Sequence, residues 1–362
     1  MRRKAISPFF SAAKITDFQS VIHTKVDKFC RILSDHQDGQ VVRLSRGWMA
    51  LTTDIITEYA FAKSYNQLDS PGFTDTLHEA LVAIYTTGHF ALHFPIVFPI
   101  LDKLPDWFVR ATQPAVLPVV GLRKDLAKHI REIREGINQR HRDAVHPTIF
   151  HELLLNANLP ESEKTDARLG DEAQLIIAAG LITTSWALNV ASFHLAKNPD
   201  LVSRIRSELA TTTTTTTNAT AAVGRPVSFN WHDLEKLPFL NSCVREAIRL
   251  SHGIVTRDPR IAPDVELLYP DPSPSANNMN PSSSSKDKKK KWKIPRGTPV
   301  SMTTVDILMN EEIFPDPKNF IPERWIDNPE LERYFVPFGK GSRQCLGIKS
   351  VHPPIFPQGA CV

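Results

Sequence analysis

Apolar residues recur at helical spacing along most of the chain, and polar or proline-containing stretches separate these segments. The spacing predicts helices over residues 15–33, 48–62, 119–137, 171–196 and 238–250. Alternating stretches are few and short, and we expect strands only at residues 41–44 and 298–302. The pattern therefore predicts a mainly α protein with small β-sheets.

Two low-complexity segments interrupt the helical pattern. A run of seven threonines opens residues 211–224, and residues 271–293 are rich in proline, serine, asparagine and lysine. Such compositions bury too little apolar surface to offset the entropy lost on folding. We expect both segments to be disordered surface insertions.

Charge changes this picture little. The 362 residues carry 43 basic and 39 acidic side chains, a net charge of +4. Residues 286–293 alone hold six lysines and one aspartate, so the rest of the chain is close to neutral. This excludes a chain-wide nucleic-acid surface, and we interpret the lysine cluster as a solvated loop. Four cysteines without CxxC spacing argue against a structural zinc site and leave a reducing compartment as the default.

The chain has no apolar run long enough to cross a bilayer. Residues 90–101 come nearest, but the stretch is short and contains two prolines and a histidine. Residues 1–11 are basic and free of acidic side chains, which fits either an organelle transit peptide or an ordinary internal helix.

One loop carries the strongest chemical signal, the sequence FGKGSRQCLG over residues 338–347. A metal-bound cysteine is a thiolate, and the bound cation keeps it deprotonated near neutral pH. Gly341 and Gly347 would let a flat cofactor approach the backbone, and Arg343 offers a planar fork that suits a carboxylate. On its own, however, Cys345 could equally be a buried, inert thiol.

The complete spacing FxxGxRxCxG, from Phe338 to Gly347, resembles the haem-binding loop of the cytochrome P450 family. The resemblance implies that Cys345 is the axial ligand of the iron of a haem b. It also implies that Phe338, Gly341, Arg343 and Gly347 belong to the cofactor-binding loop.

Two further segments resemble the same family and occur in the family's order. Residues 246–249 read EAIR, like the ExxR helix, in which Glu246 and Arg249 lie on one helical face. Residues 320–325 read FIPERW, similar to the family's PERF/W segment. The resemblance implies that Glu246, Arg249 and Arg324 form a buried, fully paired triad that braces the haem loop. Without this context, ExxR would be a surface ion pair.

A fourth segment, AGLITT at residues 179–184, departs from the family's pattern. The resemblance implies that Gly180 leaves room beside a locally loosened helix. It also implies that Thr183 and Thr184 are catalytic residues on the dioxygen side, with Thr183 relaying protons. The acid that the family places before the first threonine is Ile182 here, so proton delivery would use water and Thr183 or is impaired. Alone, the stretch would be a plain helix whose threonines bond its own carbonyls.

The resemblance also bears on the first residues. Residues 2–11 resemble the family segment that follows a residue facing the haem propionates, which favours an internal helix over a transit peptide. It implies that Arg3 is a propionate partner. Arg257 lies where the family often places another propionate-binding arginine, and Arg260 competes with it.

The resemblance implies a haem-dependent monooxygenase that inserts one atom of dioxygen into a lipophilic small molecule. Electrons would come from an NADPH-cytochrome reductase. Apolar residues at 85–98, at 175–184 and just after Gly253 are expected to line the pocket. The lead-in FPDP at 314–317 resembles the fungal microsomal branch and suggests fungal secondary metabolism. Two alternatives stay open: a truncated, catalytically defective member with weak or no haem binding, and a non-enzymatic helical interaction protein.

The resemblance implies that residues 1–362 form a partial catalytic domain, incomplete at the N-terminus and after the haem-ligand loop. For the full-length family it implies the cytosolic face of the endoplasmic reticulum membrane, with an anchor upstream of Met1. Residues 349–362 contain three prolines and a glycine where the family continues as a helix. We expect this atypical tail to come from a truncated or misread coding sequence.

Overall fold

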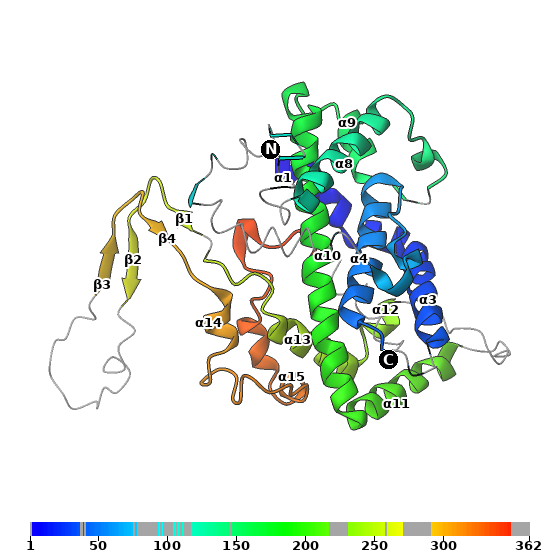
Figure 1. Cartoon of the computed structure of the whole chain (residues 1–362). Helices are drawn as coiled ribbons and strands as arrows, with labels where there is room; N and C mark the ends of the chain where they lie inside the picture. The colour runs from blue at the N-terminus through cyan, green and yellow to red at the C-terminus, as the bar shows by residue number, and fades with distance from the viewer. Residues whose placement is uncertain are drawn as a thin grey trace.

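A computed structural model describes most of the chain (Figure 1). The described residues are 2–36, 39, 41–74, 77, 93–94, 96, 104–105, 107–108, 111, 117–144, 146–216, 231–257, 259–270 and 291–348. Within them the protein is mainly helical, with two small antiparallel sheets, which confirms the predicted fold class. The tail at 349–362 lies outside the described residues, as does most of the segment 85–98.

The N-terminal part of the fold is built from helices. Its elements are α1 (Arg2–Ile6), η1 (Ser7–Phe10), α2 (Ala12–Asp17), α3 (Gln19–Asp35), α4 (Leu44–Phe61), η2 (Gln67–Asp69) and η3 (Pro71–Phe73). The expected helix over 15–33 is divided at Phe18, which joins α2 to α3. The Phe18 ring is buried 4.7 Å from that of Tyr59 and 4.5 Å from that of His146, so tertiary packing overrides the continuous helical period there.

Helices also form the middle of the chain. They are α8 (Leu117–Arg134), η5 (Arg140–Arg142), α9 (Ile149–Leu155), η6 (Glu161–Glu163), α10 (Asp166–Lys197), α11 (Pro199–Thr216), α12 (Trp231–Leu234) and α13 (Pro238–Ser251). The expectation of a disordered run from residue 211 is wrong over 211–216, where α11 continues as a helix. The Thr211 hydroxyl donates to the Glu208 carbonyl, so it bonds the helix backbone instead of competing with it.

The C-terminal part contains the strands and short helices. They are β1 (Arg260–Ile261), β2 (Leu267–Pro270), β3 (Lys291–Ile294), β4 (Pro299–Val300), α14 (Thr304–Leu308), α15 (Arg324–Asp327), η8 (Pro329–Tyr334) and η9 (Gly341–Arg343). β1 pairs with β4 and β2 pairs with β3, each antiparallel. β4 falls inside the strand expected at 298–302, whereas β3 includes residues 291–293, which had been assigned to the disordered insertion.

The expected strand at 41–44 is also wrong. Residues 41–43 are irregular, and Leu44 begins α4. The side chain of Val41 is 95% exposed. Within the described part of the chain, strand pairing is confined to β1–β4 and β2–β3, so this segment has no ladder to join.

Helix α10 is the centre of the helical body (Figure 1). It packs against α4, α8 and α13. Two polar contacts fix its register on α4: the Trp48 indole donates to the Ser192 hydroxyl at 2.9 Å, and the Thr52 hydroxyl donates to the Leu181 carbonyl at 3.3 Å. The Thr165 hydroxyl accepts from the Arg168 N–H and caps the first turn.

By length and composition, α10 could also cross a membrane, alone among the described helices. The central helix of a helical body has the same apolar composition, and α10 packs against α4, α8 and α13. We therefore treat α10 as the central helix of the fold and establish no transmembrane span.

Candidate functional site

The cysteine loop is a tight turn closed by backbone hydrogen bonds. The Cys345 N–H donates to the Phe338 carbonyl at 2.9 Å, and the Gln344 N–H donates to the Gly341 carbonyl at 3.1 Å. Gly339 has φ of 65° and Gly341 has φ of 81°, the left-handed region that favours glycine. A Cβ on Gly341 would meet no protein atom within 4 Å, so backbone conformation alone accounts for this glycine.

The Cys345 sulfur lies among groups that suit a metal-bound thiolate. The residue is exposed, and the N–H groups of Gly347 and Ile348 hydrogen-bond the sulfur. Burial raises the pKa of the Cys345 thiol, while these N–H groups and the nearby Arg3 guanidinium lower it. A cysteine on an exposed loop whose sulfur accepts from two backbone N–H groups fits the axial ligand of a haem iron, because the cation would complete the deprotonation.

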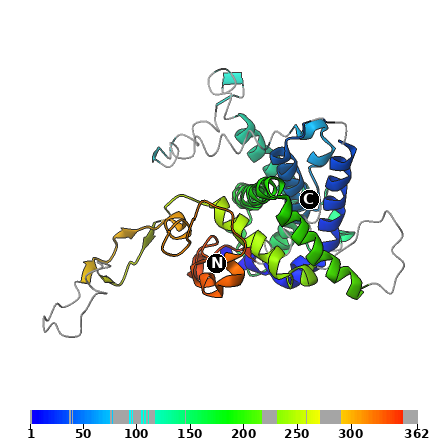
Figure 2. The ribbon, with the colours of Figure 1, turned by 90° about the horizontal axis from the view of Figure 1, so that it is seen from below.

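Arg3 reaches this loop from the opposite end of the sequence. Its guanidinium donates to the Gln344 carbonyl, next to Cys345. Figure 2 shows the N-terminus over the last described segment, in agreement with this contact. Arg343, by contrast, is exposed at the edge of the loop, and Phe338 packs edge-on against Phe335 with ring centroids 6.1 Å apart.

The structure brings Glu246, Arg249 and Arg324 together in one buried cluster. Glu246 and Arg249 are fully buried, and Arg324 is 8% exposed. The Arg249 Nε and Nη2 donate to the two oxygens of Glu246 at 2.9 and 2.8 Å, and the Arg324 Nε donates to Glu246 Oε1 at 3.1 Å. This bidentate, desolvated arrangement is far from the surface ion pair that ExxR would be alone.

Neighbouring groups complete the cluster. The Trp325 indole donates to Glu246 Oε2 at 2.9 Å, and the Ile321 N–H donates to Oε1 at 3.1 Å. Arg249 also donates to the carbonyls of Leu308 and Asn319, and Arg324 donates to those of Pro315 and Asp316. The network therefore ties α13 to α15 and to the segment from Leu308 to Ile321 that precedes it.

Trp325 was missed as a member of this cluster by reasoning from the sequence. Its position directly after Arg324 is visible in the chain, but a tryptophan beside an arginine is also an ordinary core residue. Only the fold reveals that the indole points at the second oxygen of Glu246.

In α10, Gly180 has a packing role. A Cβ on Gly180 would approach Ile56 Cγ1 and Cδ1 at 3.1 and 3.2 Å, so α4 occupies the space that was expected to be open. The helix is also continuous through 179–184, without the expected loosened turn. The Thr183 hydroxyl donates to the Ala179 carbonyl at 2.8 Å and is therefore engaged with its own helix. The catalytic roles of Gly180, Thr183 and Thr184 stay predictions.

Other expected site residues lie at the surface. Leu175 on α10 is 64% exposed, and Ile254 and Val255 are each 58% exposed. Arg257, three residues after Ile254, is also exposed. A Cβ on Gly253 would lie 3.8 Å from the carbonyl oxygen of Pro337, the residue before the cysteine loop. The chain after α13 therefore passes close to the start of that loop.

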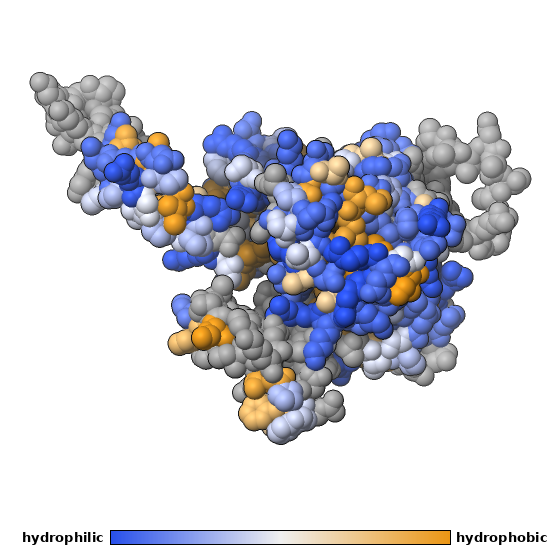
Figure 3. All heavy atoms as spheres, turned by 90° about the horizontal axis from the view of Figure 1, so that it is seen from above, coloured by the Kyte–Doolittle hydropathy of each residue, from blue (hydrophilic) through white to orange (hydrophobic). Residues whose placement is uncertain are grey.

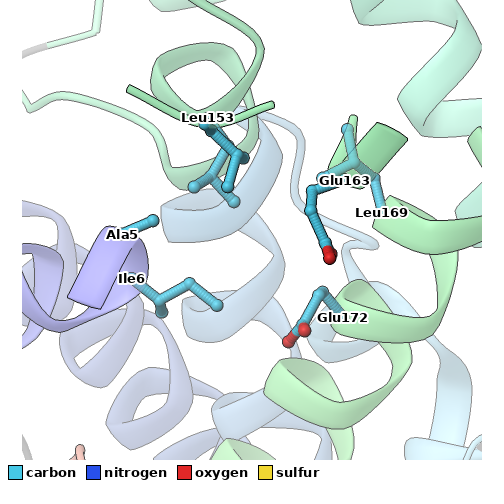
Figure 4. Close-up of a pocket in the computed structure, with 7 residues that line it drawn as sticks. Ala5, Ile6, Leu153, Glu163, Leu169 and Glu172 are labelled. Atoms are coloured by element: carbon cyan, nitrogen blue, oxygen red, sulfur yellow. The ribbon is translucent and has the colours of Figure 1, made fainter. Parts of the chain in front are cut away.

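A small hollow between α1, α9 and α10 is not the substrate pocket. Its volume is about 10 Å³, room for one water. Figure 4 shows the Glu163 carboxylate pointing toward the Glu172 side chain. Both carboxylates pair with the Arg168 guanidinium, which makes this a structural ion cluster.

Comparison with known proteins gives this geometry a family. The family model described as "Cytochrome P450" matches residues 1–267 and 283–349. This chain belongs to the cytochrome P450 family. The match spans the cysteine loop, the Glu246 cluster and the central helix of this P450, and the family implies a haem cofactor.

Three curated relatives of the chain come from fungi. The chain is 37% identical to cytochrome P450 monooxygenase sdnE of Sordaria araneosa, over 96% of this chain and 65% of that protein. It is 35% identical to tpcC of Cochliobolus heterostrophus, over 98% and 63%, and 31% identical to TRI4 of Fusarium sporotrichioides, over 96% and 61%. The chain thus spans slightly less than two thirds of the length of these relatives.

A solved structure supports the fold. The crystal structure of the cytochrome P450DA heme domain superposes with a TM-score of 0.66 at 17% identity, covering 99% of this chain and 67% of that one. At this identity the comparison concerns architecture only. It agrees with the mainly helical fold of this P450.

Proposed function

We propose that this P450 is a haem-dependent monooxygenase that inserts one atom of dioxygen into a lipophilic small molecule. The observation that carries the proposal is Cys345, an exposed residue whose sulfur accepts from two backbone N–H groups. The names of the curated relatives, each a cytochrome P450 monooxygenase, support the reaction class. Their fungal origin supports a role in fungal secondary metabolism.

The residues of the cysteine loop would bind the cofactor, proposed to be haem b. When bound, haem supplies the iron that activates dioxygen. Cys345 would hold it through sulfur, while the N–H groups of Gly347 and Ile348 spread the thiolate charge. Arg3, already at the loop, would pair with a propionate, as would Arg257.

Thr183 on α10 would hold and pass a proton at its Oγ1. In the structure this hydroxyl donates to the Ala179 carbonyl, so it has to turn to serve another acceptor. Ile182 offers no ionisable group, which leaves Thr183 and water as the proton path. Replacement of Thr183 by alanine should therefore lower product formation relative to reductant consumed, whereas the Thr184→Ala variant should lower this ratio less.

Two further parts of the proposal concern the surroundings. The family implies a redox partner, and we propose an NADPH-cytochrome reductase as the electron donor. For the full-length protein we propose the cytosolic face of the endoplasmic reticulum membrane. Exposed apolar residues on α10 and after Gly253 support a lipophilic substrate.

An isotope experiment tests the activity. The chain, supplied with haem and an NADPH-cytochrome reductase, is given a panel of lipophilic compounds under ¹⁸O₂, and products are examined by mass spectrometry. One ¹⁸O atom per product supports the proposal. The Cys345→Ser variant should form no such product, and the Cys243→Ala variant should keep the activity, because Cys243 is buried away from the loop with its pKa raised to about 12. Haem uptake without labelled product from any compound would favour a defective family member.

A further inference from the structure

The β2–β3 hairpin has two chemically different faces. Paired residues of an antiparallel ladder share a face, and successive residues alternate between faces. The register pairs Leu267 with Ile294 and Tyr269 with Trp292. One face of this ribbon is therefore entirely apolar or aromatic.

The other face is basic. Lys293 lies opposite Leu268, and the same face continues to Lys291 at the outer end of β3. Lys293 approaches Glu266 at 3.4 Å, which offsets part of its charge. The sequence immediately before β3 adds four lysines and one aspartate at positions 286–290, so the chain that leads into β3 is strongly positive.

The apolar face of the hairpin is open to solvent. Tyr269 is 52% exposed, Trp292 is 51% exposed and Leu267 is 36% exposed, while Leu268 on the basic face is 57% exposed. Figures 1 and 2 both show β2 and β3 extending away from the helical body. In Figure 3 apolar and polar atoms lie side by side on this arm. Exposed apolar side chains gathered on a projecting element are unusual unless something covers them.

We propose that the β2–β3 hairpin is a membrane-docking element that binds the surface of a bilayer containing anionic lipids. Tyr269 and Trp292 would sit at the level of the headgroups, where amphipathic rings are favoured. Leu267 and Ile294 would enter the acyl boundary, and Lys291 and Lys293 would face lipid phosphates. The inference goes beyond the proposed monooxygenase function and does not depend on haem.

The pairing of chemistries favours a lipid surface over other acidic partners. Nucleic acid or an acidic protein would use the lysines, but neither accounts for the exposed apolar and aromatic side chains on the opposite face of the same ribbon. A bilayer interface accepts aromatic, aliphatic and cationic groups at once. In the sequence, Lys291 and Lys293 stand on either side of Trp292, so cationic and aromatic groups occur together on β3.

Vesicle flotation of the full chain tests the proposal. Two vesicle types are used: pure phosphatidylcholine, and phosphatidylcholine mixed with about 30% phosphatidylserine to supply an anionic surface. Hairpin variants Tyr269→Ser/Trp292→Ser and Lys291→Gln/Lys293→Gln are compared with Trp186→Ser/Phe193→Ser. The last pair is a matched control, because Trp186 and Phe193 are 54% and 63% exposed on α10.

The proposal predicts a distinct result for each variant. The unmodified chain should float with the mixed vesicles, and its affinity should fall as salt rises. The lysine variant removes two charges worth about 1 kcal/mol each, so it should lose about thirty-fold in affinity for the mixed vesicles and little for the neutral ones. The aromatic variant should bind both vesicle types about ten-fold more weakly, and the α10 control should bind like the unmodified chain. Circular dichroism spectra that coincide among variants would show that folding is retained.

Three outcomes would overturn the inference. Flotation that is unchanged in both hairpin variants would exclude the hairpin as the docking element. Binding lost only in the α10 control would assign membrane contact to α10. Tighter binding to heparin or RNA than to the mixed vesicles, lost in the lysine variant alone, would identify a polyanion site. Because none of these assays uses haem or turnover, failure of the proposed activity would leave them interpretable.

Discussion

Replacement of Glu246 by glutamine perturbs the buried cluster with almost no change of volume. Glu246 Oε1 accepts from Arg249 Nη2, Arg324 Nε and the Ile321 N–H, and Oε2 accepts from Arg249 Nε and the Trp325 indole. A glutamine can keep its oxygen only at one of these two positions. Its NH₂ group must then face at least two donors, and the two guanidinium groups lose their counter-charge.

The magnitude follows from this count of donors. A buried donor left without an acceptor costs about 1–3 kcal/mol, and breaking a buried ion pair costs about 3–5 kcal/mol in total. Two such donors together cost about 2–6 kcal/mol, a range that contains the ion-pair figure, so we expect Glu246→Gln to lose about 3–5 kcal/mol. Because a folded domain is stable by only about 5–15 kcal/mol, this is a large part of the whole.

Urea unfolding followed by circular dichroism measures the loss. Glu332→Gln is the matched control, because the Glu332 carboxylate pairs with Arg245 and is 57% exposed. Exposed pairs contribute about 0–1 kcal/mol, so the control should unfold close to the unmodified chain. A Glu246→Gln loss no larger than that of Glu332→Gln would refute the reasoning that this cluster is desolvated and fully paired.

Three more predictions rest on other contacts. Gly180→Ala should lower the free energy of unfolding in urea by up to about 2 kcal/mol, because overpacking against Ile56 costs about 1–3 kcal/mol and helix propensity returns about 1 kcal/mol. The same change in an Ile56→Ala background should be neutral or stabilising, and equal effects in both backgrounds would contradict the contact. Burial lowers the pKa of His146 and of His151 below the ordinary 6.5, so the unfolded chain binds more protons than the folded one at acidic pH. The melting temperature should therefore fall as the pH drops below about 6.5. A melting temperature that stays flat from about pH 7 to about pH 5, the window in which histidine titrates, would count against this. The Glu208 carboxylate accepts from the Phe239 and Leu240 N–H groups at 2.9 and 2.8 Å and so caps the start of α13. Glu208→Ala should lower the free energy of unfolding in urea by about 1 kcal/mol. An unchanged free energy would show that water replaces the carboxylate as the cap.

Long periodic segments explain how much of the fold was predictable. The expected helices over 171–196 and 238–250 correspond to α10 and α13, since a sustained apolar period and a following Asn-Pro or glycine define a helix locally. The break at Phe18 depends on distant packing, and the segment at Val41 is not a strand because it has no partner strand among the described residues. The threonine run continues α11 to Thr216, although its composition predicts disorder. No local pattern records that Phe18 meets Tyr59 and His146.

The candidate site divides in the same way. Motif spacing placed Cys345, Glu246 and Arg324 in advance, because loops and helix faces fix such residues relative to their neighbours. The approach of Arg3 to Gln344, the indole of Trp325 on Glu246 and the contact of Gly180 with Ile56 each join segments far apart in the sequence. Those contacts depend on the tertiary fold, which periodicity does not specify.

The absorption difference spectrum of the reduced chain with and without carbon monoxide tests the central claim most directly. After expression with a haem supply, the unmodified chain and the Cys243→Ala variant should show the Soret shift of a thiolate-ligated haem, and Cys345→Ser should lose it. Absence of haem uptake, a Soret position without thiolate character, or a thiolate signal that survives in Cys345→Ser would contradict the assignment of Cys345 as the haem ligand of this P450.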